Sequence, residues 1–293
     1  MSSFAKVFCL SLLTVALLAG SAQARTVKGC VIKHHTDCHH KDLHGQDLHG
    51  AVLNHSVLHH INLRNANLRE ADLRYADLRK ADLRGADLSG ANLKGAKLHY
   101  YTAPKKRGAR ASQAPSSPSN CQGANLNFAK LNFANLNHAN LNCANLNYAK
   151  LYWASLEGAT LNYAHLNYAH LNYAVLTGAT LSYATLNNAK LRNAALNYAT
   201  LNYANLSYAV LTNANLNYAT LNYANLYNAN LYYATLRNAT LTNANLYYAN
   251  LSNANLSNAN LNYAVLTNAV LTNATGCSSV QPTDILYSKG CVN

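Results

Sequence analysis

Residues 199–221 read ATLNYANLSYAVLTNANLNYATL, and leucine stands at every fifth position of this stretch. The same spacing runs without exception through thirty leucines from Leu126 to Leu271, each with an alanine two residues before it. Twelve more leucines, from Leu43 to Leu98, keep the same spacing. Strict self-similarity at a short fixed period is typical of repeat architectures, in which each unit packs on its neighbours.

One repeat unit, Ala199 to Tyr203, shows why the period favours a wound strand. In extended backbone, Ala199 and Leu201 point to one side, and Thr200 and Asn202 point to the other. A straight strand would need an apolar residue at position 203, but Tyr203 stands there and the next alanine follows it. The chain must therefore turn a corner once per unit. Because a period of five does not match a helical turn, the sequence predicts a parallel β-solenoid with only Leu and Ala inside.

A second period, of twenty residues, predicts four sides per coil. The tripeptide Ala-Thr-Leu recurs at 159–161, 179–181, 199–201, 219–221 and 239–241. Stacked β-rungs favour identical neighbours, so these copies are expected to form columns. The threonine column is Thr160, Thr180, Thr200, Thr220 and Thr240, and the tyrosine column is Tyr163, Tyr183, Tyr203 and Tyr223. Ancestral duplication of a twenty-residue unit would leave the same pattern and lead to the same structural inference.

The units Ala66-Asn67-Leu68, Ala71-Asp72-Leu73 and Ala91-Asn92-Leu93 share the pattern A-(N/D)-L-x-x. This pattern resembles the pentapeptide-repeat family, and the likeness extends over about 210 residues in two blocks. The resemblance implies an all-β fold, a right-handed parallel quadrilateral β-solenoid with the central leucine and the preceding small residue inside. Forty-two such leucines, at four per coil, correspond to about ten coils. Because the family serves many roles, the resemblance specifies the fold more closely than the function.

The N-terminal residues have the pattern of a secretory signal peptide. Lys6 precedes an apolar run from Val7 to Ala19, and Ala22-Gln23-Ala24 matches a small-x-small cleavage site. We therefore expect residues 1–24 to be removed and the mature chain to be exported, either to the periplasm or out of the cell. The alternative is a short buried helix. The apolar run is too short to span a membrane, and no other segment has the required length and apolarity.

Composition divides the rest of the chain into five segments. They are a His/Cys-rich N-terminal cap (25–42), a first repeat block (43–98), a Pro/Ser-rich basic segment (99–120), a second repeat block (121–275) and a Cys-containing C-terminal cap (276–293). Leu98 and Leu126 are 28 positions apart, which is not a multiple of five. Residues 99–120 are therefore either a loop ejected from one continuous solenoid, which we favour, or a linker between two short ones.

Six cysteines remain after residue 24, and an even number in an exported chain favours disulfides. All lie at or near the ends of repeat blocks, where open solenoid rungs need caps. Spacing favours the pairs Cys30–Cys38, Cys121–Cys143 and Cys277–Cys291, although six cysteines allow fifteen connectivities. Imperfect caps would let two solenoids stack end to end as a dimer.

Charge is concentrated before the second block. Residues 25–120 hold 16 basic and 8 acidic side chains, whereas residues 121–293 hold 6 and 2. In the first block, arginines alternate with aspartates, which is typical of a solvated salt-bridge lattice: Arg64, Arg69, Arg74, Arg79 and Arg84 with Asp72, Asp77, Asp82 and Asp87. Some pentapeptide-repeat proteins bind DNA gyrase by resembling DNA in shape and negative charge, and a basic, exported chain is not expected to do so. Positive charge in that compartment fits anionic envelope polymers or membrane surfaces better than nucleic acid.

The second block presents Asn, Thr, Ser and Tyr outward, and its asparagines are expected to form hydrogen-bonding ladders along the stack. We call the threonine and tyrosine columns together the ladder face. Corner tyrosines would stack on one another, or else offer an aromatic strip to sugars or a partner surface. The threonine column is similar to the Thr-x-Thr ranks of β-helical ice-binding proteins, but its second rank is mostly Asn and bulky tyrosines flank it.

Nine histidines lie within residues 34–60. On the twenty-residue period, the candidate ligands pair between coils as His35 with His55, His39 with His59 and His40 with His60. Imidazoles one rung apart could share Zn²⁺ or Cu²⁺. They could equally titrate at about pH 6 and loosen the cap in acid, or be surface residues of no fixed role. Their spacing matches no recognised ligand motif.

No catalytic constellation stands out. Glu157 and Asp284 are the only acids after residue 121, and no phosphate-binding glycine loop or Ser/His/Asp group rises above the repeat background. We therefore predict a non-enzyme with no required cofactor, an exported solenoid that serves as a structural scaffold or binds a protein or an envelope polymer. The alternatives are metal binding through the N-terminal histidines, and binding of ice or polysaccharide by the ladder face.

Overall fold

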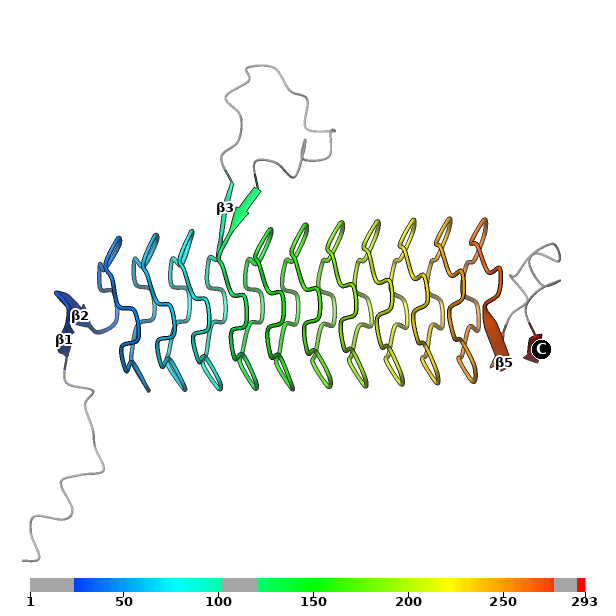
Figure 1. Cartoon of the computed structure of the whole chain (residues 1–293), viewed down its shortest axis with the longest axis horizontal. Coiled ribbons are helices and arrows are strands. Elements are labelled where there is room, and N and C mark those ends of the chain that lie inside the picture. The colour runs from blue at the N-terminus through cyan, green and yellow to red at the C-terminus, as the bar shows by residue number, and fades with distance from the viewer. Residues whose placement is uncertain (1–23, 102–120, 277–288, 293) are drawn as a thin grey trace, which may run out of the picture.

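The computed structural model describes residues 24–101, 121–276 and 289–292, and these residues form an elongated all-β solenoid (Figure 1). In the described part of the chain, no helix is long and apolar enough to cross a membrane. Residues 1–23, which hold nearly all of the predicted signal peptide, lie outside the described residues, as do residues 102–120, 277–288 and 293.

The twenty-residue period of the sequence is the period of the coil. Thr160, Thr180 and Thr200 are joined one to the next by parallel bridges, and the same spacing holds on each side of the coil. The leucine and alanine of each pentad face inward, and the inward leucines from Leu43 to Leu271 expose at most 2% of their surface. Each leucine contributes about 1.5–3 kcal/mol on burial, so the leucine column stabilises every coil. The predicted fold class is confirmed.

Backbone carbonyls satisfy four of the five N–H groups in an interior pentad. In the pentad 199–203, the N–H groups of Leu201 and Tyr203 donate to carbonyls of the next coil at 2.7 and 2.9 Å. The N–H of Thr200 donates to the preceding coil at 2.9 Å, and Ala204 closes the corner with a 3.0 Å bond to the Leu201 carbonyl. The N–H that follows each leucine has no backbone acceptor in this scheme, so it requires a side chain.

The last residue of each pentad turns the corner with a positive φ, as the third residue of a type II turn does. The value is 59° at Tyr203, 58° at Asn213 and 65° at Gly178. Glycine and asparagine adopt this left-handed conformation readily, whereas for other residues it costs about 1–2 kcal/mol. At many corners that carry Tyr, His or Trp, ring stacking between coils offsets part of this cost, as between Tyr203 and Tyr183.

The two repeat blocks form one continuous solenoid. Asp82, Asp87, Asn92 and Lys97 pair with the residues 43 positions further on, where other residues pair at a separation of twenty. The chain leaves the coil through β3 (His99–Tyr101) and returns through β4 (Cys121–Gly123), and the two strands pair antiparallel (Figure 1). A Cβ at position 123 would lie 2.4 Å from backbone atoms of the next coil, so only glycine fits there.

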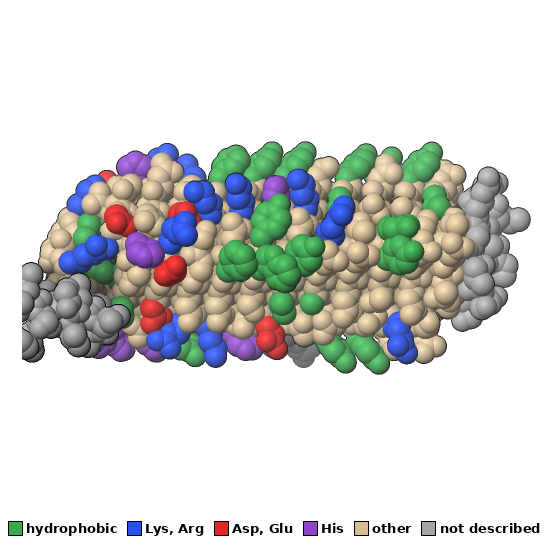
Figure 2. Space-filling model, turned by 90° about the horizontal axis from the view of Figure 1, so that it is seen from below, with side chains coloured by type: hydrophobic (Ala, Val, Ile, Leu, Met, Phe, Trp, Pro, Cys, Tyr) green, Lys and Arg blue, Asp and Glu red, His purple; other side chains and the backbone are tan. Residues whose placement is uncertain are grey.

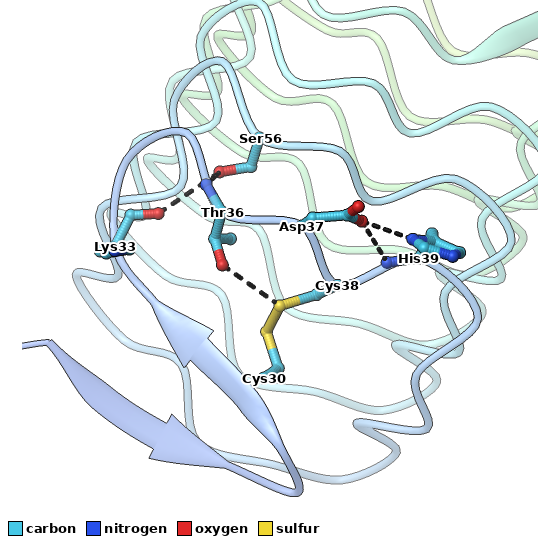
Figure 3. The surroundings of a disulfide bond; sticks show 7 residues. All are labelled: Cys30, Lys33, Thr36, Asp37, Cys38, His39 and Ser56. Atoms are coloured by element: carbon cyan, nitrogen blue, oxygen red, sulfur yellow. Dashed lines mark hydrogen bonds and ion pairs between the residues drawn. A yellow bond between two sulfur atoms is a disulfide. The ribbon is translucent and has the colours of Figure 1, made fainter.

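The N-terminal end of the solenoid carries a hairpin and a disulfide. Strands β1 (Arg25–Val27) and β2 (Cys30–Ile32) pair antiparallel. Cys30 is bonded to Cys38, and their Cα atoms are 5.3 Å apart (Figure 3). Cys38 stands at a leucine position and is fully buried. The bond therefore joins the hairpin directly to the inside of the first coil, in the pairing that spacing favoured.

At the other end, β5 (Val270–Thr275) pairs in parallel with β6 (Lys289–Val292). Cys277 lies outside the described residues, and only the backbone of Cys291 is described, so the Cys277–Cys291 bond stays a prediction. Cys143 is disulfide-bonded. The side chain of Cys121 lies outside the described part of the chain, so that pairing also stays a prediction.

The corner geometry predicts that, of two substitutions at Asn213, one is neutral and the other destabilises the fold. Asn213→Gly should leave the midpoint of urea unfolding nearly unchanged, because both residues accept the φ of 58° at this exposed corner. Asn213→Val should destabilise the fold by about 1–2 kcal/mol, because a branched Cβ is strained in the left-handed region. Equal midpoints for the two variants would contradict the assignment of the corner.

Candidate functional sites on the outer surface

Many Asp and Asn residues that precede a leucine accept the N–H of the residue after that leucine. This is the N–H that has no backbone acceptor. Asp72 Oδ1 accepts the N–H of Arg74 at 3.2 Å, and Asn225 Oδ1 accepts the N–H of Tyr227 at 3.1 Å. This contact, two residues along the chain, is the one by which Asx side chains replace a backbone acceptor in turns. Many asparagines that were expected to form ladders are therefore local caps.

In several pentads where another residue precedes the leucine, an asparagine on the preceding coil supplies the acceptor. Asn142 Oδ1 accepts the N–H of Asn162 at 2.8 Å, and Asn162 Oδ1 in turn accepts the N–H of Ser182 at 2.9 Å. Asn222 does the same for Thr242 at 3.1 Å. These pentads contain Thr160, Thr180 and Thr240, whose side chains have no carbonyl oxygen with which to cap their own pentad. One asparagine ladder thus runs beside the threonine column, and another, formed by Asn147, Asn167 and Asn187, runs in a different column.

The threonine column stacks as expected, but its hydroxyls also take part in contacts within the solenoid. Thr160 Oγ1 donates to Asn140 Oδ1 at 3.1 Å, and Thr180 Oγ1 accepts from Asn162 Nδ2 at 3.1 Å. Thr240 Oγ1 is buried and has no hydrogen-bond partner in the described structure. The column is half-buried along its length, so its hydroxyls do not form a uniform, outward-facing array.

The tyrosine column is a continuous stack of rings. Tyr163 and Tyr183 lie 4.9 Å apart, and the next two steps, to Tyr203 and Tyr223, are 4.8 Å each, with interplanar angles of 5° or less. Stacked rings cover one another's faces, so the column presents ring edges and hydroxyl groups outward. Tyr203 remains 47% exposed in this arrangement. The geometry fits edge contacts and hydrogen bonds better than the face-on stacking that sugars use on aromatic platforms.

Aspartates of the first block pair with arginines inside their own pentads. Arg74, Arg79 and Arg84 contact Asp72, Asp77 and Asp82 respectively through the guanidinium group, in addition to the backbone cap. The hydrogen bond from the Arg74 side chain lowers the pKa of Asp72, against the opposing effect of partial burial. The predicted salt-bridge lattice is thus a series of local pairs, each of which offsets one positive charge at the surface.

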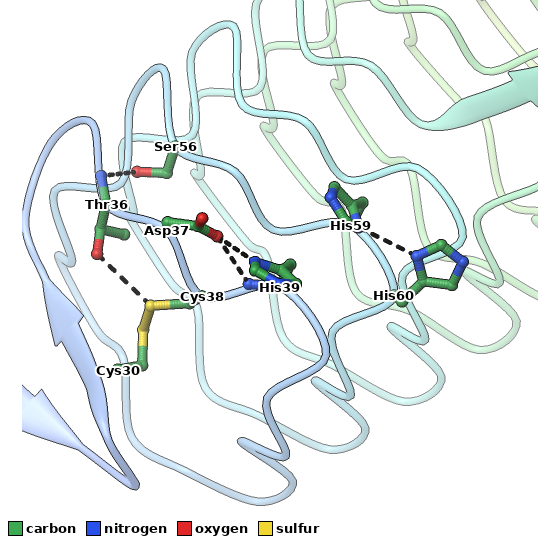
Figure 4. Close-up of polar contacts among 8 residues, drawn as sticks. All are labelled: Cys30, Thr36, Asp37, Cys38, His39, Ser56, His59 and His60. Carbon is green, nitrogen blue, oxygen red and sulfur yellow. Dashed lines mark hydrogen bonds and ion pairs between the residues drawn. A yellow bond between two sulfur atoms is a disulfide. The ribbon is translucent and has the colours of Figure 1, made fainter.

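The first coils gather four histidines into one cluster, His39, His40, His59 and His60. Figure 4 shows three of them, His39, His59 and His60. The rings of His40 and His60 stack at 4.5 Å, and Nδ1 of His59 lies 3.1 Å from Nδ1 of His60. His39 hydrogen-bonds Asp37 through its own Nδ1. Candidate donor atoms of His40, His59 and His60 all lie within 4.8 Å of one another. We call these three residues the histidine triad.

Two of the six candidate metal ligands, His35 and His55, lie outside this cluster of four, in a different column. His35 stacks on His55 at 5.1 Å, and His55 stacks on Tyr75 at 5.0 Å. Neither belongs to a group of metal-ligating side chains within the described residues. Sequence spacing had placed all six histidines in one set, because it identifies which residues stack but not which columns lie close together.

The environment of the triad disfavours protonation of His60. Desolvation by neighbouring atoms lowers the pKa of His60, although its side chain is exposed, and electrostatic repulsion from His40 and Lys80 acts in the same direction. The carboxylate of Asp37 lies on the opposite side of the cluster, where its hydrogen bond with His39 lowers its own pKa. Neutral imidazole is the form that binds metal ions, and it is the form that these surroundings favour at His60.

The comparison with protein families assigns the repeats. The family model for pentapeptide repeats matches in eight copies, over residues 61–99 and, in overlapping segments, 119–275. The chain belongs to the pentapeptide-repeat family. Its solenoid is accordingly the right-handed quadrilateral β-helix of that family. The chain matches no curated protein.

Solved pentapeptide-repeat structures resemble the chain to different degrees. HetL from the cyanobacterium Nostoc sp. strain PCC 7120, a protein involved in heterocyst differentiation regulation, is 33% identical, with 82% of this chain and 89% of HetL covered and a TM-score of 0.61. QnrB1, a plasmid-mediated fluoroquinolone resistance protein, is 15% identical over 89% of this chain and 92% of its own, with a TM-score of 0.32. Rfr23 from the cyanobacterium Cyanothece 51142 is 39% identical over 33% of this chain and 63% of its own, with a TM-score of 0.21.

This pentapeptide-repeat protein also exposes aromatic residues that the sequence analysis did not single out. Phe128, Phe133 and Trp153 occupy corners at the start of the second block, and Phe133 is 67% exposed. Trp153 stacks on Tyr173 at 4.3 Å. On the face shown in Figure 2, charged side chains and histidines concentrate toward the N-terminal part, and hydrophobic side chains, which include tyrosine, gather over the second block. The corner position two residues after each leucine is the signal that identifies them.

The hydrogen bond from the Thr242 N–H to the Asn222 side chain on the preceding coil predicts that Asn222 protects this amide from exchange. Asn222→Ala should remove the acceptor of the Thr242 N–H and cost about 1 kcal/mol, which corresponds to roughly fivefold faster hydrogen exchange at that amide. Asn222→Asp is the matched control, because it keeps an oxygen at the same place, as Asp72 does for Arg74. Equal acceleration in both variants would show that the side-chain oxygen does not protect the amide.

Proposed function

We propose that this protein is an exported, non-enzymatic scaffold that binds a protein or a polymer of the cell envelope through the outer columns of residues 121–275. The observation that carries this proposal is that each pentad has two inward residues, which are buried, and three outward residues, which stand at regular spacing on the surface. Leu and Ala occupy every inward position of that block, and the outer residues repeat at the spacing of one coil. Such a surface offers many equivalent weak contacts, which suits an extended or repetitive partner.

Export is supported by residues 1–24 and by the cysteines. A disulfide such as Cys30–Cys38 persists in an oxidising compartment and is rare in the cytosol. A scaffold exposed outside the cytoplasm also gains from a cap that is closed covalently, because an open first rung is a template for pairing with other chains. These features favour the periplasm or the medium as the place where the binding occurs.

The absence of enzymatic activity in this proposal is supported by the contacts that three aspartates of the first block make. Asp72, Asp77 and Asp82 each cap a backbone N–H and hold an arginine of the same pentad. Carboxylates committed in this way are poorly suited to the proton transfers of general acid–base catalysis. The stiffness and regularity of the solenoid suit binding instead.

A binding experiment with substitutions in the tyrosine column tests this proposal. The chain is mixed with isolated envelope and with proteins of the culture medium, and binding is measured as a function of added protein. We expect saturable binding that falls at least about tenfold, roughly 1.4 kcal/mol, when the four tyrosine-column residues are replaced by Asn. Asparagine already stands at corners such as Asn188 and Asn213, so the replacement keeps the turn geometry.

The matched control replaces four corner tyrosines outside the ladder face by Asn, namely Tyr148, Tyr168, Tyr198 and Tyr218. This variant should bind like the wild type, and circular dichroism should be the same for all three proteins. Absence of saturable binding by the wild type, or equal loss in both variants, would overturn the proposal that the tyrosine column carries recognition.

Ice binding by the ladder face makes a separate prediction. Because Thr160 and Thr180 use their hydroxyls within the stack and the column is half-buried, we expect no thermal hysteresis at millimolar protein. A freezing-point gap that grows with protein concentration and disappears in Thr180→Tyr would show that the threonine column does bind ice.

A further inference from the structure

We propose that the histidine triad, His40, His59 and His60, is a binding site for a divalent transition-metal ion of the Zn²⁺ and Cu²⁺ class. The site lies on the first coils, at the N-terminal end of the outer columns that carry the ladder face further along the rod. It uses none of the ladder-face residues, so it is independent of the scaffold function proposed above. It would give the N-terminal end of the solenoid a ligand of its own.

The distances between donor atoms fit one ion. Metal–nitrogen bonds of about 2.0–2.1 Å in a tetrahedral site place two ligand nitrogens about 3.3 Å apart. Nδ1 of His59 and Nδ1 of His60 are already 3.1 Å apart, and candidate donor atoms of all three residues lie within 4.8 Å of one another. Small rotations of the exposed His40 ring would bring the third nitrogen to bonding distance.

The solenoid holds the backbones of the three residues in place. His40 and His60 are corners in the same column, one coil apart, with φ of 57° and 58°. The N–H of His40 donates to the carbonyl of His59 at 3.2 Å, so two of the ligands are linked by the backbone ladder itself. The Cys30–Cys38 disulfide lies two residues before His40 and restrains the same coil. A site prepared in this way loses little conformational entropy when an ion binds.

Corner stacking alone does not account for the triad. His35 and His55 stack in the same way at 5.1 Å, as the corner tyrosines do, so the pairing of His40 with His60 follows from the fold. His59 is not a corner residue. Its Nδ1 nevertheless lies 3.1 Å from Nδ1 of His60, a contact that stacking between corners does not require. The third imidazole is what distinguishes a metal site from an ordinary stack.

The surroundings define the class of ion and the kind of site. Three neutral imidazoles suit Zn²⁺, Cu²⁺ or Ni²⁺, with Cu²⁺ bound most tightly, and do not suit Ca²⁺ or Mg²⁺. Lys80 and Arg79 act on His60 with positive charge, and Asp37 beside His39 offsets part of it. His40 and His60 are exposed and His59 is half-buried. Water would complete the coordination, so we infer an exchangeable ion and not a closed structural one.

Zinc titration of the untagged full chain, with its disulfides intact and after removal of metal by chelation, tests the site. Isothermal calorimetry with Zn²⁺ alone should show one saturable site per chain. The triple variant His40→Asn/His59→Asn/His60→Asn should weaken binding at least about tenfold, because all three ligands are lost. Asparagine already occurs after leucines and at corners in this chain, so the variant should fold, and circular dichroism checks that it does.

The double variant His35→Asn/His55→Asn is the matched control, because it removes two stacked histidines of the other column and leaves the triad intact. It should bind Zn²⁺ like the wild type. Electron paramagnetic resonance of the Cu²⁺-loaded protein should show nitrogen ligation that is lost only in the triple variant. Absence of saturable binding, or an equal loss in the triple and double variants, would overturn the proposal.

Discussion

The solenoid depends on one constraint, that every backbone N–H must find an acceptor while the chain turns a corner after each five residues. Contacts between coils and the corner bond satisfy four N–H groups of a pentad, as around Leu201. In many pentads the fifth is satisfied by an Asn or Asp oxygen, from the same pentad at Asn225 or from the preceding coil at Asn142. Burial specifies the leucine and alanine, φ restricts the corner, and this remaining N–H accounts for the asparagine that pervades the second block.

This constraint also explains where chemical diversity can occur. Inward positions tolerate only apolar residues of the right size, and the residue before each leucine is largely occupied with capping. The corner, within the limit set by its positive φ, and the residue after the leucine, where it does not cap the next coil, vary in chemical type. Aromatic stacks exploit the first of these positions, and the triad combines both on neighbouring coils, at His60 and His59. The histidines thus occur at outward positions that neither pack the core nor cap their own pentad.

The two periods of the sequence were sufficient to predict the coil and its columns, because inward positions are nearly invariant and identical residues stack. Other features depend on information that periods do not contain. A break of 28 positions after Leu98 shows that the phase slips but not where the chain returns, so the continuity across β3 and β4 had to come from the structure. Asn140 and Asn142 look equivalent in sequence, yet the first caps its own pentad and the second caps the next coil. The split between the triad and the His35–His55 stack likewise depends on which columns are neighbours.

The insertion between β3 and β4 distinguishes two ways in which a chain of this kind can change length. Within the coil, only whole pentads can be added or removed, since any other number would move leucines out of the core, and only whole coils of twenty residues keep every outer column aligned. At the antiparallel exit, the coil resumes in register whatever the number of residues between His99 and Gly123. Evolution can therefore lengthen the rod in steps of five residues, or of twenty where the outer columns must stay aligned, whereas at this one point it can append a segment of another size without altering the rod.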